Sequence, residues 1–271
     1  MSKPRSIAVA QTCPVRGDVD ANLAEHLRLI PIAASEGARV VVFPELSLTG
    51  YEMDIAAGLA FTERDPRLAP LAAAAASHDV SVLVGAPVRI GTKLYIGALI
   101  LEPGGATRLY TKHHLGAFGD SARVDGTVPP AEATVFHAGD RNPLLDIGGN
   151  PAAVAVCADI GYPEHARNAA AMGAKNYLAS TFVIRSDFAG DSAKLRRYAV
   201  EHRMTVALAN FGSPSGGLIA AGRSSIWSDT GDLLVQLEPT GSGVAIARET
   251  PKGWQAKAVM VESLQVATPR A

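Results

Sequence analysis

Short apolar runs alternate with stretches of helical spacing along the first third of the chain. Residues 6–10, 39–43 and 80–86 have the length and the apolar composition of buried strands. Between them, residues 18–36 carry apolar side chains at helical spacing, and residues 64–78 are rich in alanine. The pattern therefore predicts β-α-β-α-β, which is typical of an α/β fold.

The middle of the chain predicts a hairpin followed by a long irregular segment. Residues 95–101 and 107–111 are strand-like runs on either side of a Glu-Pro-Gly-Gly turn signal. Residues 116–150 hold many Gly, Pro and Asp residues and show little periodicity. Loops of this length inside compact domains are more often functional than accidental, so we expect a role for this segment.

A cysteine ends the next apolar run. Residues 152–156 predict a short buried strand that stops at Cys157, and Pro163 suits the first turn of a helix over residues 164–172. Cys157 would then lie in a strand-to-helix turn, where outward-facing backbone N–H groups can lower the pKa of a thiol. A free cysteine is more often a small buried hydrophobe, so this stretch alone assigns no role.

The remaining chain changes from α/β alternation to hairpins. Residues 176–180 and 205–210 predict strands, and residues 191–203 predict a helix with Asp191 as its N-cap. No linker-like change of composition interrupts the chain, so we expect a single domain over residues 1–271. Towards the C-terminus, turn signals without helices separate further strands, at residues 224–227, 233–237 and 244–248.

Composition and charge narrow the classes of partner. Hydrophobic residues make up 48% of the chain and charged residues 19%, with no apolar run long enough to span a membrane, so we expect a globular protein. The net charge of −1 and the lack of a Lys/Arg cluster argue against nucleic-acid binding. Residues 1–5 lack a secretory signal and the chain has only 2 cysteines, so we expect a cytoplasmic protein. The 7 histidines show no metal-binding spacing, so no metal is expected.

Three residues with strong chemistry share one sequence context. Glu45 follows VVVFP, Lys112 follows TRLYT, and Cys157 follows AAVAV, so each comes at or just after the end of a predicted strand. In α/β sheets this edge carries ligand-binding loops, and the three side chains could meet there.

If Glu45, Lys112 and Cys157 lie together, their side chains can carry out acyl transfer. A thiol is mostly protonated at neutral pH, so attack on an amide needs a base, and Glu45 is the candidate. Lys112 and the backbone amide of Ala158 are candidates to stabilise the oxyanion, and neither a metal nor an organic cofactor is required.

Several segments, in order, resemble the nitrilase (carbon-nitrogen hydrolase) superfamily over nearly the whole chain. They include PELSLTGY, YTKHHL, VAVCADIGYPEHAR, LRRYAVEHRMTVALANFG and AGRSSIWSDTGDLL. The resemblance implies a four-layer α-β-β-α sandwich and a Glu-Lys-Cys triad made of Glu45, Lys112 and Cys157. It also implies a second glutamate, matched by Glu132 in EATVFHAGD, that positions Lys112 and the substrate. The alternative for Glu132 is a carboxylate on a loop surface.

The residues that choose the substrate are harder to identify from the sequence. Tyr51, Tyr162, Phe182, Arg185 and Phe188 are placed to line a pocket around the same strand ends. Arg185 is the one fixed positive charge among them and could bind an anionic substrate, although a solvent-facing side chain is an equal alternative.

The nucleophile segment favours the amidase-like branch of the superfamily. Cys157-Ala158-Asp159 resembles the amidases and carbamoylases, whereas true nitrilases typically carry Cys-Trp-Glu. We therefore expect hydrolysis of a small amide or N-carbamoyl compound through a thioester. The alternatives are a nitrilase and a binding member of the family that has lost catalysis. A papain-like hydrolase lacks support, since no histidine segment resembles that partner. Ala158 replaces a residue that is often aromatic in the family, and residues 116–130 match no particular branch.

Association is expected through the helix that follows the nucleophile. Family members commonly pair subunits there, and Ala166, Ala169, Ala170 and Ala171 would permit close helix approach. The chain of 271 residues has no long C-terminal extension, so we expect a homodimer or a closed oligomer and no filament.

Overall fold

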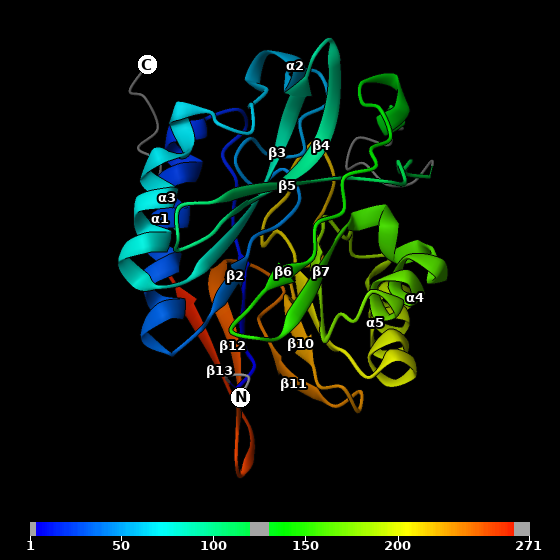
Figure 1. Cartoon of the computed structure of the whole chain (residues 1–271). Coiled ribbons are helices and arrows are strands. Elements are labelled where there is room, and N and C mark those ends of the chain that lie inside the picture. The colour runs from blue at the N-terminus through cyan, green and yellow to red at the C-terminus, as the bar shows by residue number, and fades with distance from the viewer. Residues whose placement is uncertain (1–3, 120–129, 263–271) are drawn as a thin grey trace.

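Two β-sheets form the centre of the molecule. The computed structural model describes residues 4–119 and 130–262. The seven-stranded sheet has the order β13-β12-β1-β2-β3-β4-β5, and the six-stranded sheet has the order β11-β10-β9-β8-β7-β6. A pair of helices covers the outer face of each sheet (Figure 1), so the expected α-β-β-α sandwich is confirmed.

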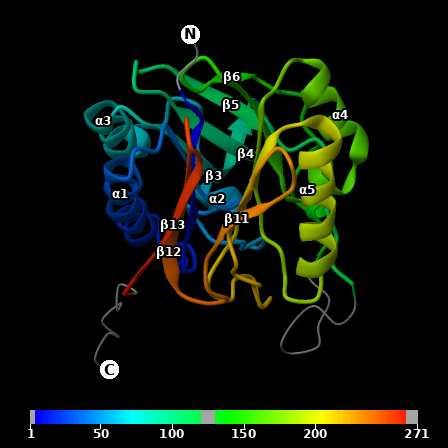
Figure 2. The ribbon, with the colours of Figure 1, turned by 90° about the horizontal axis from the view of Figure 1, so that it is seen from below.

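Parallel strands form the centre of the first sheet. They are β1 (Ser6–Gln11), β2 (Val40–Val42) and β3 (Ser81–Ile90), and the crossover helices α1 (Val19–Ser35) and α3 (Ala69–His78) lie side by side on the outer face (Figure 2). Antiparallel strands extend this sheet on both sides: β4 (Lys93–Leu101) and β5 (Thr107–Thr111) beyond β3, and β12 (Ser242–Thr250) and β13 (Gly253–Val261) beyond β1.

The second sheet repeats this plan. Its parallel strands are β7 (Pro151–Val156), β8 (Asn176–Ser180) and β9 (Thr205–Ala209), and the helices α4 (Pro163–Ala171) and α5 (Phe188–His202) cover its outer face. Antiparallel strands complete it: β10 (Ser225–Trp227) and β11 (Leu233–Gln236) beyond β9, and β6 (Leu145–Asp146) beyond β7.

The alternation of side chains along the strands builds the layers. Val9 in β1 and Val154 in β7 belong to the core between the two sheets, whereas Ala8 and Ala153 face the helices of their own halves. Strands that are buried on both faces are continuously apolar, which is why these segments read as unbroken apolar runs. The core between the sheets fixes their carboxyl edges against each other.

Direct hydrogen bonds join the two sheets at that edge. Ser180 Oγ, at the end of β8, donates to the carbonyl of Phe43, just after β2, at 2.8 Å. Glu45 N donates to the carbonyl of Thr181 at 3.4 Å. The segments that follow β2 and β8 therefore meet, and they bring residues of both sheets to one place.

The predicted N-cap of α5 is wrong. The helix begins at Phe188 with Asp187 at the N-cap position, and Asp191 lies in the first turn, where it accepts a hydrogen bond from Lys194 Nζ at 2.9 Å. The reason is packing: the Phe188 ring is buried in the core under α5, so the helix starts three residues earlier.

Several elements carry little sequence signal. The edge strand β13 is largely exposed, and β6 has two residues, so neither shows a clear apolar run. The same holds for the short helices α2 (Ala56–Leu59) and η1 (Pro66–Leu68). Part of the predicted irregular segment, residues 120–129, lies outside the described residues. Within the described ranges, no helix is both long enough and apolar enough to cross a membrane.

Candidate active site

A completely buried lysine lies between two carboxylates at the edge where the sheets meet. Lys112 follows β5, and its Nζ lies 2.7 Å from Glu45 Oε1 and 2.7 Å from Glu132 Oε1. Glu45 follows β2, and Glu132 begins the short 3-10 helix η2 (Glu132–Thr134). Burying charged groups is costly unless they are paired, so the fold holds this ion cluster in place by its geometry.

The nucleophile candidate comes from the other sheet. Cys157 follows β7 directly and has a φ of 43°, in the left-handed region that residues other than glycine rarely adopt. Its Sγ donates to the carbonyl of Phe182 at 3.5 Å, and the residue stays partly exposed. The 3-10 helix η3 (Cys157–Gly161) begins here, so the amide of Ala158 lies in a first turn, where N–H groups lack an acceptor within the helix.

The backbone around Glu45 packs so closely against β3 that position 85 has no room for a side chain. A Cβ added to Gly85 in β3 would lie 2.3 Å from Leu46 N and 2.5 Å from Pro44 O. Leu46 itself has a φ of 52°. Gly85 therefore allows the turn after β2 to pack directly against β3. This contact fixes the backbone position from which the Glu45 carboxyl extends into the site.

The two glutamates have different hydrogen-bond partners. Glu132 Oε1 accepts from both Lys112 Nζ and the Tyr51 hydroxyl at 2.7 Å, and its Oε2 accepts from Gly116 N at 2.7 Å. Glu45 uses only Oε1, because its Oε2 is buried without a hydrogen-bond partner among the described residues. Glu132 is thus fixed on every side, whereas Glu45 keeps an oxygen that can accept a proton.

Burial and neighbouring charges set the protonation states. Burial raises the pKa of Glu45 to about 7, with Lys112 opposing the rise and Glu132 adding to it. Burial disfavours the Lys112 ammonium, but both carboxylates outweigh this and raise its pKa, so it stays charged. Burial, together with the charge of Glu45, raises the pKa of Cys157 well above its usual value. The thiol pKa is therefore raised and not lowered, so the thiol keeps its proton at neutral pH.

Aromatic rings form one wall of the site. The Tyr51 ring lies 4.9 Å from the Phe182 ring and 5.7 Å from the Phe118 ring, measured between centroids. Tyr51 and Phe182 were expected here from the sequence. Phe118 and Gly116 were not, because nothing in their irregular segment marks them.

The structure does not bring Tyr162 and Arg185 to the triad. Tyr162 is 41% exposed and stacks on His114 with a centroid distance of 3.6 Å. The exposed Arg185 lines a separate cavity of about 420 Å³ together with Phe188 and Arg223. Among the described residues that line this cavity, none belongs to the triad.

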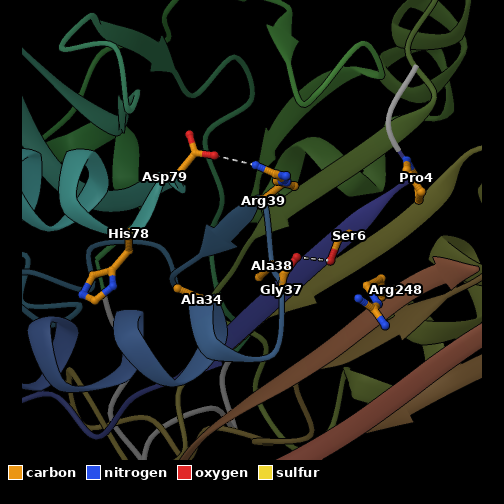
Figure 3. A pocket seen from close by; sticks show the side chains of 9 residues that line it. All are labelled: Pro4, Ser6, Ala34, Gly37, Ala38, Arg39, His78, Asp79 and Arg248. Carbon is orange, nitrogen blue, oxygen red and sulfur yellow. Dashed lines mark hydrogen bonds and ion pairs between the residues drawn. The ribbon is translucent and has the colours of Figure 1, made fainter. Parts of the chain in front are cut away.

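Another cavity, of about 380 Å³, lies at the opposite edge of the first sheet (Figure 3). Ser6 and Arg39 mark the starts of β1 and β2, and Arg39 pairs with Asp79 at 2.6 Å. The cavity is lined by this ion pair and by the carboxyl ends of α1 and α3. It lies at the end of the strands opposite to the end that carries Glu45. Across the described residues, no group of three or more His, Cys, Asp or Glu side chains could hold a metal.

Comparisons with known proteins identify relatives over most of the chain. The chain is 30% identical to the hydrolase in pqqF 5′ region of Pseudomonas protegens, over 90% of this chain and 79% of that protein. It is 27% identical to a nitrilase of Pyrococcus abyssi, over 89% and 88% of the two chains.

Among solved structures, the fold matches a cysteine-to-alanine variant of the amidase of Nesterenkonia sp. AN1. The TM-score is 0.79 with 26% identity, over 92% of this chain and 91% of that one. Another variant of that amidase shows covalent addition of the acetamide moiety of fluoroacetamide at its active-site cysteine. The family model described as carbon-nitrogen hydrolase matches residues 6–258. The chain therefore belongs to the carbon-nitrogen hydrolase family, within the nitrilase superfamily.

Proposed function

We propose that the protein hydrolyses the carbon-nitrogen bond of a small amide or N-carbamoyl compound through a thioester on Cys157. The observation that carries the proposal is the pair of Glu45 and Lys112 at the thiol. One buried oxygen of Glu45 has no hydrogen-bond partner among the described residues, and the other accepts from the charged Lys112, while the pKa of Glu45 is about 7. This arrangement supplies a base and a cation at the same point.

Acylation begins when Glu45 accepts the proton of the Cys157 thiol as Sγ attacks the carbonyl carbon. The electron pair of the carbonyl double bond moves to its oxygen. The third N–H of Lys112, which neither carboxylate uses, and the amide of Ala158 stabilise that oxyanion. The carbon-nitrogen bond then breaks, and Glu45 returns the proton to the leaving nitrogen, which departs as ammonia or an amine.

Deacylation runs the same proton transfers with water. Glu45 accepts a proton from a water molecule, and the oxygen attacks the thioester carbon. The carbon-sulfur bond breaks, the acid leaves, and Glu45 gives the proton back to Cys157. Glu132 has both oxygens in hydrogen bonds, so it holds Lys112 and takes no part in proton transfer.

The aromatic wall supports a small acyl group. Tyr51, Phe118 and Phe182 surround the approach to Cys157 with apolar surface, and the Tyr51 hydroxyl is bound by Glu132. Lys112, the cation that bonds Glu132, is already paired with two carboxylates, which favours an uncharged acyl part.

A nitrile is the second candidate substrate, because a nitrilase is among the relatives. Attack on a nitrile gives a thioimidate, which needs protonation and two water molecules before the acid leaves. The Cys157-Ala158-Asp159 segment, with Ala158 after the nucleophile, favours the amide. A catalytically silent member of the family is disfavoured because the chain keeps Glu45, Lys112 and Cys157, and Lys112 Nζ lies 2.7 Å from Glu45 Oε1.

Matched pairs of small amides and nitriles with the same acyl group decide the substrate class. We expect faster release of ammonia from the amides, measured side by side with purified protein, and no turnover by a Cys157→Ala variant. Faster turnover of the nitriles would assign the alternative. Full activity of Cys157→Ala would contradict the thioester mechanism altogether.

A further inference from the structure

A buried carboxylate behind the nucleophile connects the two catalytic segments. Asp159 is completely buried, and its Oδ2 accepts from Val156 N at 3.0 Å and from the Tyr110 hydroxyl at 2.6 Å. Its Oδ1 accepts from His114 N at 2.9 Å and lies 3.0 Å from His114 Nδ1. Val156 precedes Cys157, while Tyr110 and His114 lie two residues to either side of Lys112. One side chain thus ties the nucleophile to the lysine.

Two further groups continue the hydrogen bonds away from the reaction. The Tyr110 hydroxyl lies 2.9 Å from His165 Nε2 on α4, and His165 Nδ1 lies 2.8 Å from the Tyr177 hydroxyl on β8. Burial lowers the pKa of His165, so its ring is neutral and carries one N–H.

The direction of each bond follows from the carboxylate end. An ionised carboxylate only accepts, so Tyr110 donates to Asp159 and its oxygen is left to accept from His165 Nε2–H. His165 Nδ1 is then the acceptor for the Tyr177 hydroxyl. The three side chains Tyr110, Asp159 and His165 are called the Asp159 network below.

The nucleophile needs such support because its own backbone is strained. A non-glycine residue at a φ of 43° persists only when its surroundings hold it there. The bond from Val156 N to Asp159 spans the turn that carries Cys157. The bonds from Tyr110 and His114 hold the same carboxylate to the strand end that carries Lys112.

We infer that the Asp159 network positions Cys157 relative to Lys112 and that Tyr110 and His165 are positioning residues of the reaction. The inference rests on the proposed function, since it assigns the network to the attack of Cys157 on a carbonyl. None of its members touches the thiol or the ammonium in a described contact. The network sets the position and orientation of the sulfur, and a small displacement of the sulfur from its line of attack lowers the rate.

Two tyrosines of the same kind provide a matched test. Tyr110 and Tyr177 are both completely buried, and each can lose its hydroxyl by a change to phenylalanine. We expect Tyr110→Phe to lower kcat about ten-fold to a hundred-fold with KM changed less than about three-fold. The Tyr177 hydroxyl bonds only His165 among described groups, so we expect Tyr177→Phe to change kcat less than about three-fold. Equal effects of the two variants on kcat, or a wild-type kcat in Tyr110→Phe, would overturn the inference.

A second pair tests His165 by rescue. Glutamine retains an N–H donor and an oxygen acceptor, whereas leucine retains neither. We expect His165→Gln to keep most of the kcat that His165→Leu loses, although both variants stay folded by circular dichroism. If the two variants have the same kcat, then His165 supports the fold alone and the inference fails.

The alkylation of Cys157 separates this inference from the proposed function. Iodoacetamide alkylates Cys157 without any substrate, and mass spectrometry of the Cys157 peptide measures the rate. This rate reports the orientation and reactivity of the sulfur. We expect Tyr110→Phe to slow it and Tyr177→Phe to leave it near the wild-type rate. If the wild-type protein hydrolyses no amide, carbamoyl compound or nitrile, the proposed function fails. The alkylation rates then decide the positioning inference by themselves.

Discussion

Glu45 and Glu132 both bind Lys112, and their different hydrogen-bond partners suit them to different roles in the proposed reaction. The sequence points to Glu45, Lys112 and Cys157 because their residue types match the chemistry, and to Glu132 through the family resemblance. It does not show that both oxygens of Glu132 are hydrogen-bonded while one oxygen of Glu45 has no partner among the described residues. Those facts depend on Tyr51, Lys112 and a backbone amide that converge from distant segments. For the same reason the raised pKa of the thiol was not predicted.

The pKa of Glu45 predicts an acidic limb in the pH profile. Burial raises this pKa to about 7, and the carboxyl must be ionised to accept the thiol proton, so kcat/KM falls as the pH decreases through about 7. The profile of kcat/KM from pH 5 to pH 9 measures it. The negative charge of Glu132 adds to the raised pKa, so Glu132→Gln moves the limb to lower pH. A limb that stays in place in that variant would show that Glu45 is not the group that titrates.

At the scale of elements, the predictions succeed where burial leaves a periodic signal. The strands β1, β7, β8 and β9 are apolar on both faces and are readable as runs. The exposed edge strand β13 is not, and the start of α5 is set by a buried phenylalanine that no capping rule detects. The sequence likewise does not show that Arg185 lines a cavity with Phe188 and Arg223, because Arg223 comes from a separate segment of the chain.

The glycine beside the base gives a sharp test of element packing. Gly85→Ala places a methyl group against the backbone of Pro44 and Leu46, so we expect the free energy of unfolding to fall by about 1–3 kcal/mol or more. Activity falls as well, because the turn that carries Glu45 must shift. Urea unfolding followed by circular dichroism measures the first effect, and amide hydrolysis measures the second.

Gly190→Ala in α5 is the matched control for this change. A Cβ there meets nothing within 4 Å, and alanine in a helix stabilises by about 0.5–1 kcal/mol relative to glycine. We expect this variant to be as stable as the wild type or slightly more stable, with unchanged turnover. A Gly85→Ala protein that matched it in both measurements would refute the packing argument.

At the scale of the molecule, association of two subunits through the helix after the nucleophile stays a prediction. Of the four alanines expected at the interface, Ala166 and Ala169 are buried in the protein's own core and cannot contact a second subunit, whereas Ala170 is partly exposed and Ala171 is exposed. Met172, directly after α4, is 44% exposed, and Val200 of α5 is 50% exposed. The proposed dimer interface therefore rests on these larger apolar side chains.

Light scattering tests the dimer. We expect a mass of twice the 28.1 kDa chain at micromolar concentration, and a shift towards the single chain in Met172→Glu. Leu233→Glu on β11 is the control, because Leu233 is 52% exposed but belongs to another element of the second sheet. A wild-type protein that scatters as a single chain contradicts the proposal, and so does a control that dissociates equally.

The proposed base Glu45 and Lys112 come from one sheet and the proposed nucleophile Cys157 comes from the other, so neither half holds the complete proposed site. Turnover is thereby a measure of how the two sheets sit on each other. An exchange of one aliphatic side chain for another in the central core can preserve folding and still tilt Cys157 away from Glu45. Substitutions that widen the range of substrates are for this reason expected in the surrounding loops and not on the inner faces of the strands.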